Sequence, residues 1–286
     1  MIPTNTVICG DALTVLQSLQ SETINMCCTS PPYFSLRDYG VAGQLGLEPT
    51  YSEYITKLCD VFDEVKRVLR GDGTLWVNMG DSYSGSSGGH PSPFQAKARR
   101  FNHTFPKPPR TDVPKKSLYL IPFRFSIAMV QRGWILRNVL IWKKPNALPE
   151  SVTDRFTVDF EYLFFFTKSR HYYFEQQFEP AVYQQGLRNK RSIFSINTRP
   201  LAANHFAAYP EELVETPITA GCPLGGIVLD PFLGSGTTAL VARRLGRQWL
   251  GIELNPAYVR LALERLQTNA AVSQSYTSSC NVVKRR

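Results

Sequence analysis

The motif Thr29-Ser30-Pro31-Pro32-Tyr33 combines residue types that can hold a planar ligand carrying an amino group. Two adjacent prolines remove backbone donors and fix φ, so the turn presents a hydroxyl, carbonyl oxygens and an aromatic ring in a rigid arrangement. Ser30 and the Pro31 carbonyl can accept the amino hydrogens while Tyr33 stacks on the ligand ring. An ordinary strand-to-loop turn is the alternative interpretation, because short motifs also occur by chance.

A second motif, Asp230-Pro231-Phe232-Leu233-Gly234-Ser235-Gly236-Thr237-Thr238, lies between a predicted strand and a predicted helix. Its glycines let the backbone approach a ligand closely, and the first amides of the helix suit an anionic group. The loop lacks the Gly-Lys-Ser/Thr ending of a nucleoside triphosphate loop and the full dinucleotide fingerprint. Glu253 follows about 20 residues later, where an acid can accept hydrogen bonds from ribose hydroxyls. The pattern indicates a ligand with a ribose and a small anionic end.

Hydrophobic periodicity predicts the elements that position these motifs. Apolar runs rich in strand formers occur at residues 6–9, 25–29, 74–79, 135–142, 162–166, 227–229 and 249–252. Helical spacing extends over residues 51–69, 238–245 and 257–267, and we expect the first of these helices to begin at a Thr50/Glu53 capping box and to close at Gly71. The alternation predicts an α/β fold whose mostly parallel sheet is covered by helices on both faces.

The composition indicates a globular protein with a polyanionic partner. The chain has 286 residues, enough for a single α/β domain over residues 1–286, and its formal net charge of +9 favours phosphate-rich partners. No apolar run has the length of a membrane span and residues 1–10 lack a signal-peptide pattern, so we expect a cytoplasmic protein with no membrane association. Cysteine and histidine spacings predict no metal site.

Three stretches fall outside the alternation and are predicted to lie on the surface. Residues 82–116 form a basic insertion, either a solvated loop or a nucleic-acid contact through Lys97, Arg99, Arg100, Lys107 and Arg110. Residues 175–204 form a candidate target-recognition region that carries Arg188, Lys190 and Arg191. Residues 270–286 are polar, end in basic residues, and are expected to form a flexible basic tail.

The Ser-Pro-Pro-Tyr turn, the glycine loop and Gly251-Ile252-Glu253 together resemble the DNA amino-methyltransferases. The turn precedes the loop, as in the permuted beta class, and the resemblance is to its N4-cytosine-specific modification methyltransferases of the Ser-Pro-Pro-Tyr type. It covers nearly the whole chain, including residues 142–146 and 205–210. It implies a Rossmann-like, S-adenosylmethionine-dependent methyltransferase fold, with a seven-stranded mostly parallel sheet, an antiparallel edge and a circularly permuted motif order.

The resemblance also implies a role for each motif residue. S-adenosyl-L-methionine is the implied cofactor, and its methionine end would contact a loop shaped by Asp230 and lined by Phe232, Gly234, Ser235, Gly236 and Thr237. Glu253 would hold the ribose and Asp11 the adenine amino group, with a simple helix N-cap as the alternative for Asp11. The strands carrying Asp11 and Glu253 should then be neighbours, and the two termini should lie close together.

The implied reaction is methyl transfer to the exocyclic amino group of a base flipped out of double-stranded DNA, with Ser30, Pro31, Pro32 and Tyr33 as catalytic residues. Cytosine N4 ranks above adenine N6 because adenine enzymes of the family usually carry Asp or Asn in place of Ser30. Adenine N6, RNA or protein glutamine, and a non-catalytic basic DNA-binding module are the alternatives. Arg37 would contact phosphate or pair with Asp38. A cognate restriction endonuclease is an open partner, and the protein would be a monomer or a homodimer.

Overall fold

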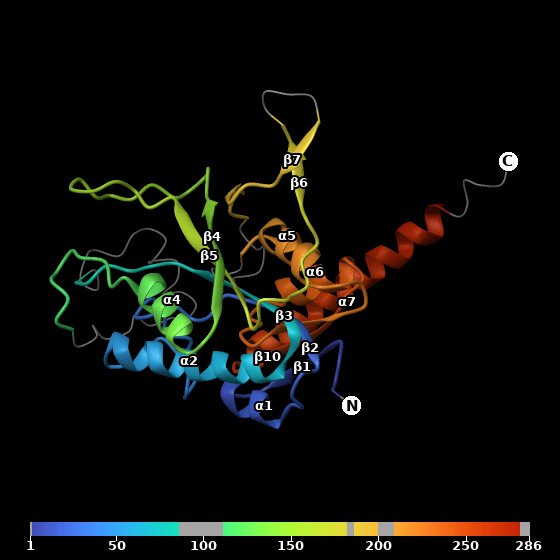
Figure 1. Cartoon of the computed structure of the whole chain (residues 1–286), viewed down its shortest axis with the longest axis horizontal. Helices are drawn as coiled ribbons and strands as arrows, with labels where there is room; N and C mark the ends of the chain where they lie inside the picture. Colours follow the sequence, from blue (N-terminus) through green and yellow to red (C-terminus); the bar gives the residue numbers. More distant parts are fainter. Residues whose placement is uncertain (1, 86–110, 182–185, 200–208, 281–286) are drawn as a thin grey trace.

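The computed structural model describes residues 2–85, 111–181, 186–199 and 209–280, with side chains described as far as residue 268. Its centre is an eight-stranded sheet with the order β1-β10-β9-β2-β3-β5-β4-β8 (Figure 1). These strands are β1 (Thr6–Cys9), β2 (Ile24–Thr29), β3 (Leu69–Met79), β4 (Ile135–Lys143), β5 (Phe160–Thr167), β8 (Ile193–Ser195), β9 (Ile227–Asp230) and β10 (Gln248–Glu253). All seven predicted strands are present, within two residues of their predicted starts except β3.

Strand β5 is antiparallel to both of its neighbours, β3 and β4, and every other pairing in this sheet is parallel. The predicted α/β class with a mostly parallel sheet is confirmed, with two differences in detail. The antiparallel strand lies inside the sheet rather than at its edge. An eighth strand, β8, extends the sheet beyond β4 through Ile141–Lys143. It has three residues, which is too short to give a period-2 signal in the sequence.

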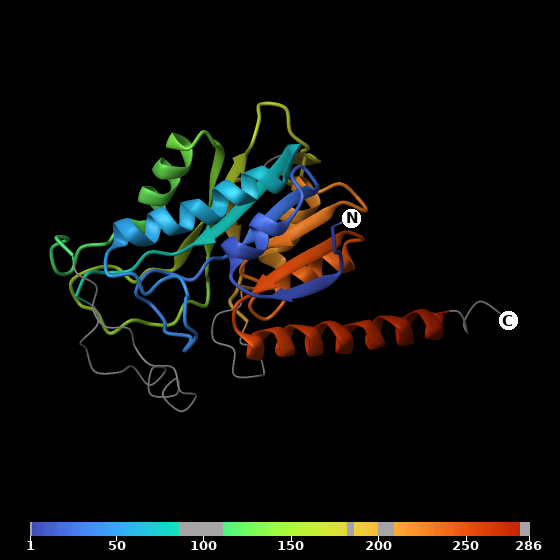
Figure 2. The same cartoon turned by 90° about the horizontal axis from the view of Figure 1, so that it is seen from below.

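Helices cover both faces of the sheet, as predicted (Figures 1 and 2). One face carries α1 (Ala12–Ser18), α2 (Tyr51–Val68) and α4 (Ile121–Gln131), and the other carries α5 (Glu211–Gly221), α6 (Thr237–Arg244) and α7 (Pro256–Cys280). Adjacent residues Cys27 and Cys28 point into the two different cores, because successive side chains of a strand face opposite sides. Burial on both faces explains why the centre of β2, residues 26–28, is apolar at every position.

Helix α2 begins as predicted but ends differently. Thr50 accepts a hydrogen bond from the Glu53 backbone at 3.2 Å, so the helix starts at the expected cap. The expectation that Gly71 closes the helix is wrong. Leu69 caps the helix in an extended conformation and is itself the first residue of β3, so Gly71 lies within that strand. The buried Leu69 side chain directs the chain straight into the sheet, and no left-handed glycine is needed.

The permuted order places the first and last strands of the large sheet side by side. Strand β1 pairs with β10 in parallel, with Cys9 opposite Glu253, so the predicted proximity of these strands is confirmed. The expected proximity of the termini is not met within the described residues. Helix α7 continues to Cys280, beyond the predicted end at residue 267, and extends away from the sheet (Figure 2). Residues 270–280 of the predicted flexible tail are therefore helical, and residues 281–286 lie outside the described part.

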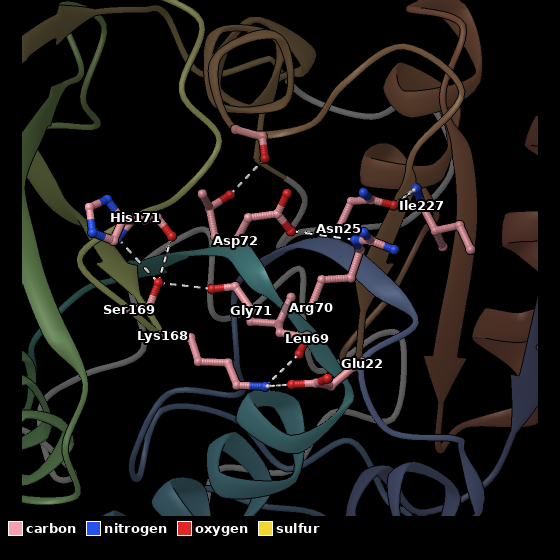
Figure 3. A network of polar contacts seen from close by, with 12 residues as sticks. Glu22, Asn25, Leu69, Arg70, Gly71, Asp72, Lys168, Ser169, His171 and Ile227 are labelled. Atoms are coloured by element: carbon pink, nitrogen blue, oxygen red, sulfur yellow. Dashed lines mark hydrogen bonds and ion pairs between the residues drawn. The ribbon is translucent and has the colours of Figure 1, made fainter.

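A polar network holds the end of the sheet where β3 begins and β5 ends (Figure 3). Lys168, which follows β5, donates to the Leu69 carbonyl at 2.8 Å and pairs with Glu22 at 3.2 Å. Ser169 donates to the Gly71 carbonyl at 2.9 Å. These contacts join backbone segments at one end of the strands. The motif residues lie at the opposite end, where the parallel strands have their carboxyl termini.

A short hairpin of β6 (Phe178–Pro180) and β7 (Leu187–Asn189) stands apart from the large sheet (Figure 1). It belongs to the predicted target-recognition region, for which the sequence indicated no strand. Among the helices of the described residues, none combines the length and apolarity required to cross a membrane.

Candidate active site

The Ser-Pro-Pro-Tyr turn and the glycine loop meet at the carboxyl ends of neighbouring strands. Strand β2 leads into the turn and β9 leads into the loop, and these two strands pair in parallel. Thr29, the last residue of β2, donates a hydrogen bond to the Asp230 carboxylate at 2.6 Å. The two motifs, separated by about 200 residues in sequence, therefore form one site, as parallel-sheet topology predicts for ligand sites.

The turn is fixed from behind by a buried tyrosine and a glycine. Tyr54 of α2 is fully buried and donates its hydroxyl to the Pro32 carbonyl at 2.8 Å. Gly46 has φ +96°, and a Cβ atom there would lie 2.8 Å from the Tyr33 carbonyl oxygen. The backbone N–H of Ser35 donates to the Gly46 carbonyl at 2.8 Å. Position 46 thus requires glycine for both its conformation and its space.

The Tyr33 hydroxyl is the centre of a polar chain that sequence reasoning missed. It donates to the Glu161 carboxylate at 2.6 Å, and Lys144 pairs with the other oxygen of Glu161 at 2.5 Å. Ser30 donates to the Tyr33 hydroxyl at 3.5 Å. Burial and then the Glu161 charge raise the pKa of Tyr33 well above its usual value, so the phenol stays protonated. The only sign of Glu161 in the sequence is that it is an acidic residue beside the aromatic residues of 160–167.

Asp230 organises the glycine loop. Its carboxylate is 2% exposed and accepts hydrogen bonds from Thr29, from Thr238 at 2.5 Å, from Tyr209 at 3.2 Å and from the Phe232 backbone at 3.1 Å. Burial raises the pKa of Asp230, while these hydrogen bonds oppose the rise because they favour the charged form. The Asp230 carboxylate thus joins the start of the loop to β2 and α6, and its place in a cofactor site stays a prediction.

The loop itself turns into helix α6 through left-handed glycines. Gly234 has φ +54° and Gly236 has φ +83°, and no side chain caps the helix that starts at Thr237. Arg265 of α7 supports the loop, donating to the Ser235 carbonyl at 2.6 Å and to its hydroxyl at 2.8 Å. The sequence did not single out Arg265. The uncapped helix start suits an anionic ligand group.

Glu253 and Asp11 lie beside the loop, at the ends of the paired strands. The Glu253 carboxylate accepts from the backbone N–H groups of Gly234 and Asn255, both at 2.8 Å, and burial raises its pKa. Asp11 is the N-cap of α1 and accepts from the Thr14 backbone at 2.9 Å. The helix-cap interpretation of Asp11 is thus confirmed. Cofactor contacts of Asp11 and Glu253 stay predictions.

The segment that follows the turn approaches the same strand ends. The Tyr39 and Tyr258 rings make an edge contact at 6.0 Å. Burial raises the pKa of both hydroxyls, that of Tyr258 to about 12; the charge of Arg37 opposes the rise and the charge of Glu253 adds to it. Asp38 accepts from the Gly40 backbone at 2.8 Å. Arg37 therefore lies close to the Glu253 end of the site, and its phosphate contact stays a prediction.

The predicted nucleic-acid contacts are only partly within the described residues. Lys97, Arg99, Arg100, Lys107 and Arg110 lie outside them. Arg188 pairs with Glu179 across the β6–β7 hairpin at 2.9 Å, and Lys190 donates to Thr216 at 2.9 Å. Arg191 is exposed. Within the described part of the chain, no cluster of three or more His, Cys, Asp or Glu residues could hold a metal ion.

Comparison with known proteins identifies the family. A family model described as DNA methylase, covering N6 and N4 methyltransferases, matches residues 24–264, which include both motifs of the site. The chain belongs to this DNA methylase family. It is therefore a DNA methyltransferase of the N4/N6 amino-methyltransferase type, as its motifs predicted.

Relatives of this DNA methylase include Type II methyltransferases of bacteria. M.XycI of Xanthomonas campestris pv. cyanopsidis is 47% identical over 92% of this chain and 88% of its own length, and M.SmaI of Serratia marcescens is 43% identical over 91% and 90%. Among solved structures, the cytosine-N4-specific PvuII DNA methyltransferase superposes with a TM-score of 0.66 at 22% identity, covering 92% of this chain and 86% of that one. A putative DNA modification methylase from Thermus thermophilus, complexed with S-adenosyl-L-methionine, gives 0.62 at 24% identity, covering 91% of this chain and 92% of that one.

Proposed function

We propose that this DNA methyltransferase is site-specific and transfers a methyl group from S-adenosyl-L-methionine to N4 of a flipped cytosine. The observation that carries the proposal is the Thr29–Asp230 hydrogen bond of 2.6 Å, because it joins an amine-binding turn to a cofactor-type glycine loop. A non-catalytic DNA-binding module would need neither motif, nor a link between them.

S-adenosyl-L-methionine is the cofactor, and the residues present fit it. Left-handed Gly234 and Gly236 bring the backbone close to the ligand space, and the uncapped start of α6 can receive the carboxylate of the methionine end. Glu253 is the last residue of β10 and Asp11 follows the neighbouring β1, so the two would meet the ribose and the adenine. Phe232, Ser235 and Thr237 complete the proposed pocket. When bound, the cofactor would supply an electrophilic methyl group on its sulfonium; the S–CH₃ bond would break to leave a neutral thioether, and the methylated amine would release one proton to solvent.

The turn would hold the target base against that methyl group. Ser30 Oγ and the Pro31 carbonyl would accept the two amino hydrogens, which leaves the nitrogen lone pair directed at the electrophile. The Tyr33 ring would stack on the flipped base, an interaction that contributes about 1 to 3 kcal/mol and offsets part of the unstacking cost. Pro31 and Pro32 keep the turn rigid, and Tyr54 fixes the Pro32 carbonyl.

The choice of cytosine rests on Ser30. A serine hydroxyl can accept one amino hydrogen, whereas adenine-specific members of the family usually carry Asp or Asn at this position. The double-stranded DNA substrate would be engaged by Arg37, by Arg188, Lys190 and Arg191 near the β6–β7 hairpin, and by the basic residues of 82–116. The Type II relatives favour a cognate restriction endonuclease as the biological partner.

Expression in cells that lack their own DNA methylation tests the proposal. Genomic DNA sequenced for modified bases should carry N4-methylcytosine at one recurring short sequence, and DNA from cells expressing the Ser30→Ala variant should carry far less. N6-methyladenine at a recurring sequence would refute the choice of cytosine and retain the rest. Modified cytosines scattered without a common sequence would refute site specificity.

A further inference from the structure

The hydroxyl of Ser30 can either donate or accept a hydrogen bond. Its surroundings must therefore determine whether it accepts from the target amine. A target amino group brings only hydrogens to be accepted, and Ser30 assists it only if its own proton points elsewhere. Beside water or another neutral hydroxyl, the Ser30 hydroxyl would populate both the donating and the accepting orientation. The surroundings of Tyr33 determine the direction.

Glu161 is an acceptor without hydrogens. Its carboxylate pairs with the Lys144 ammonium at 2.5 Å, with both side chains less than one-fifth exposed, 18% for Lys144 and 17% for Glu161. A paired, ionised carboxylate can only accept hydrogen bonds. The Tyr33 hydroxyl, 2.6 Å away, therefore gives its single proton to Glu161.

The remaining neighbours of the Tyr33 hydroxyl agree with that direction. Asn78 turns its amide nitrogen to the Tyr162 carbonyl at 3.2 Å, so it presents its oxygen to Tyr33 and cannot donate to it. Hydrogen bonds from Ser30 and the Gly80 backbone lower the pKa of Tyr33, as donors to its oxygen do, against the larger opposing effect of burial. The Tyr33 oxygen thus accepts from Ser30, whose contact is 3.5 Å.

We propose that Glu161, held by Lys144, is a positioning residue that orients the hydrogen bonds Ser30→Tyr33→Glu161 and so keeps the Ser30 lone pairs free for the target amine. The inference rests on the proposed function, in which Ser30 accepts from that amine. Glu161 and Lys144 do not touch the base in this account. They act through the Tyr33 hydroxyl, and the Lys144 position beside the Trp142 ring, 4.6 Å from the ring centroid, helps to fix the pair.

Glu161→Gln is the informative change because it keeps the shape of the side chain. Lys144 has only donors, so the new amide would turn its oxygen to Lys144 and its NH₂ group to Tyr33. Tyr33 would then accept there, and its proton would be shared between the Asn78 oxygen at 3.3 Å and the Ser30 hydroxyl at 3.5 Å, so the fixed direction of the chain would be lost. The single-turnover rate of methyl transfer should fall about tenfold, less than the roughly 100-fold expected when a transition-state hydrogen bond is removed outright, because the Ser30 hydroxyl is still present.

The test is a double-mutant cycle with Tyr33→Phe, which removes the hydroxyl and keeps the stacking ring. Tyr33→Phe alone should also lower the single-turnover rate about tenfold, while fluorescence of 2-aminopurine at the target position reports unchanged base flipping. Adding Glu161→Gln to Tyr33→Phe should change the rate less than twofold, since no hydroxyl remains to be reoriented. Glu64→Gln, which breaks a comparable ion pair with Arg67 on α2, is the matched control and should keep the wild-type rate.

A rate loss from Glu161→Gln that is equally large in the Tyr33→Phe background would overturn the proposal, because Glu161 would then act without the hydroxyl. A wild-type rate for Tyr33→Phe would overturn it as well, even if Glu161→Gln failed to fold. Cofactor affinity, measured by calorimetry, should be unchanged in every variant. The cycle is run on whichever base the wild-type enzyme methylates, so an adenine product would refute the proposed cytosine specificity and still test Glu161.

Discussion

Ser30 is the residue on which the proposed chemistry depends most directly. It is half-buried at the end of β2, next to Thr29, whose bond to Asp230 fixes the distance between turn and loop. Replacing Ser30 with Ala should lower the single-turnover rate about 100-fold, as for the loss of one transition-state hydrogen bond. Cofactor affinity should not change, because Ser30 lies outside the proposed cofactor pocket. Quenched-flow methyl transfer and calorimetry measure the two quantities.

Ser52→Ala, on the exposed first turn of α2, is the control for the loss of a serine hydroxyl and should keep the wild-type rate. A Ser30→Ala enzyme that transfers methyl groups at the wild-type rate would remove Ser30 from the mechanism.

The reactivity of the individual cysteine thiols can also be predicted from their burial. Burial raises the pKa of Cys27 and Cys28 well above the usual value and that of Cys59 and Cys222 to about 12, whereas Cys9 is exposed. A thiol with a raised pKa gains almost no thiolate between about pH 7 and about pH 9, and thiolate is the reactive form. In a Cys280→Ser background, maleimide should therefore label Cys9 alone in the folded protein across this range.

Mass spectrometry of the digested protein locates the label, and labelling in denaturant serves as the control in which all five remaining cysteines react. Rapid labelling of Cys27 or Cys28 in the folded protein would show that β2 is not buried on both faces.

Some residues of the site could not be predicted because only the fold brings them together. Ser30, Tyr33, Asp230 and Glu253 belong to contiguous motifs, whose spacing is visible in the sequence. Glu161 lies 128 positions from Tyr33 and meets it only because antiparallel β5 pairs with β3. Arg265 reaches the glycine loop from α7 in the same way. Such partners have no local signal beyond a charge in an apolar surrounding.

Among the elements, the loop before α2 supports the backbone of the Ser-Pro-Pro-Tyr turn, and changes in this loop should affect the turn. Gly46 and Gly43 both have positive φ, but only at Gly46 would a Cβ atom meet the Tyr33 carbonyl, at 2.8 Å. Gly43→Ala should cost about 1 kcal/mol of stability from backbone strain alone. Gly46→Ala should cost more and should also lower the methyl-transfer rate about tenfold, since the turn must move away.

Chemical denaturation gives the two stabilities, and single-turnover kinetics give the two rates. Gly43→Ala is the matched control for strain, because nothing lies within 4 Å of its added methyl group. Equal rates for the two variants would mean that the position of the Tyr33 backbone does not limit catalysis.

Helices and strands could be predicted where they were long and their apolar residues recurred at regular spacing. Helix α2 carried eight buried residues at helical spacing, and its start was marked by Thr50 and Glu53. The end of α2 was not predicted, because Leu69 serves both as its cap and as the start of β3. Strands β6, β7 and β8 have three residues each, so pairing rather than sequence pattern defines them.

At the scale of the whole molecule, charge determines how the enzyme meets its substrate. The formal net charge of +9 on 286 residues favours a polyanion, and neutralised phosphates release counterions. DNA affinity should therefore fall at least about 10³-fold between about 50 mM and about 200 mM salt, if at least six phosphates are contacted. Cofactor affinity should change little over the same range, because the proposed cofactor residues Ser235, Thr237 and Glu253 are buried and are not part of the exposed basic surface.

Fluorescence anisotropy of labelled duplex DNA and calorimetry with the cofactor measure the two dependences side by side. A DNA affinity insensitive to salt would contradict the proposed role of the basic residues. Because β1 lies next to β10, residues from the beginning and the end of the sequence can contribute to the proposed cofactor pocket.

The proposed reaction of this site is the methylation of cytosine N4 with the help of Ser30. Purified protein is incubated with unmethylated duplex DNA and S-adenosyl-L-methionine carrying an isotopically labelled methyl group, and the DNA is digested to nucleosides for mass spectrometry. The wild-type enzyme should place the label in N4-methyldeoxycytidine, and Ser30→Ala should place strongly reduced amounts there. Label in N6-methyldeoxyadenosine, or equal labelling by the two proteins, would refute methylation of cytosine N4 through Ser30.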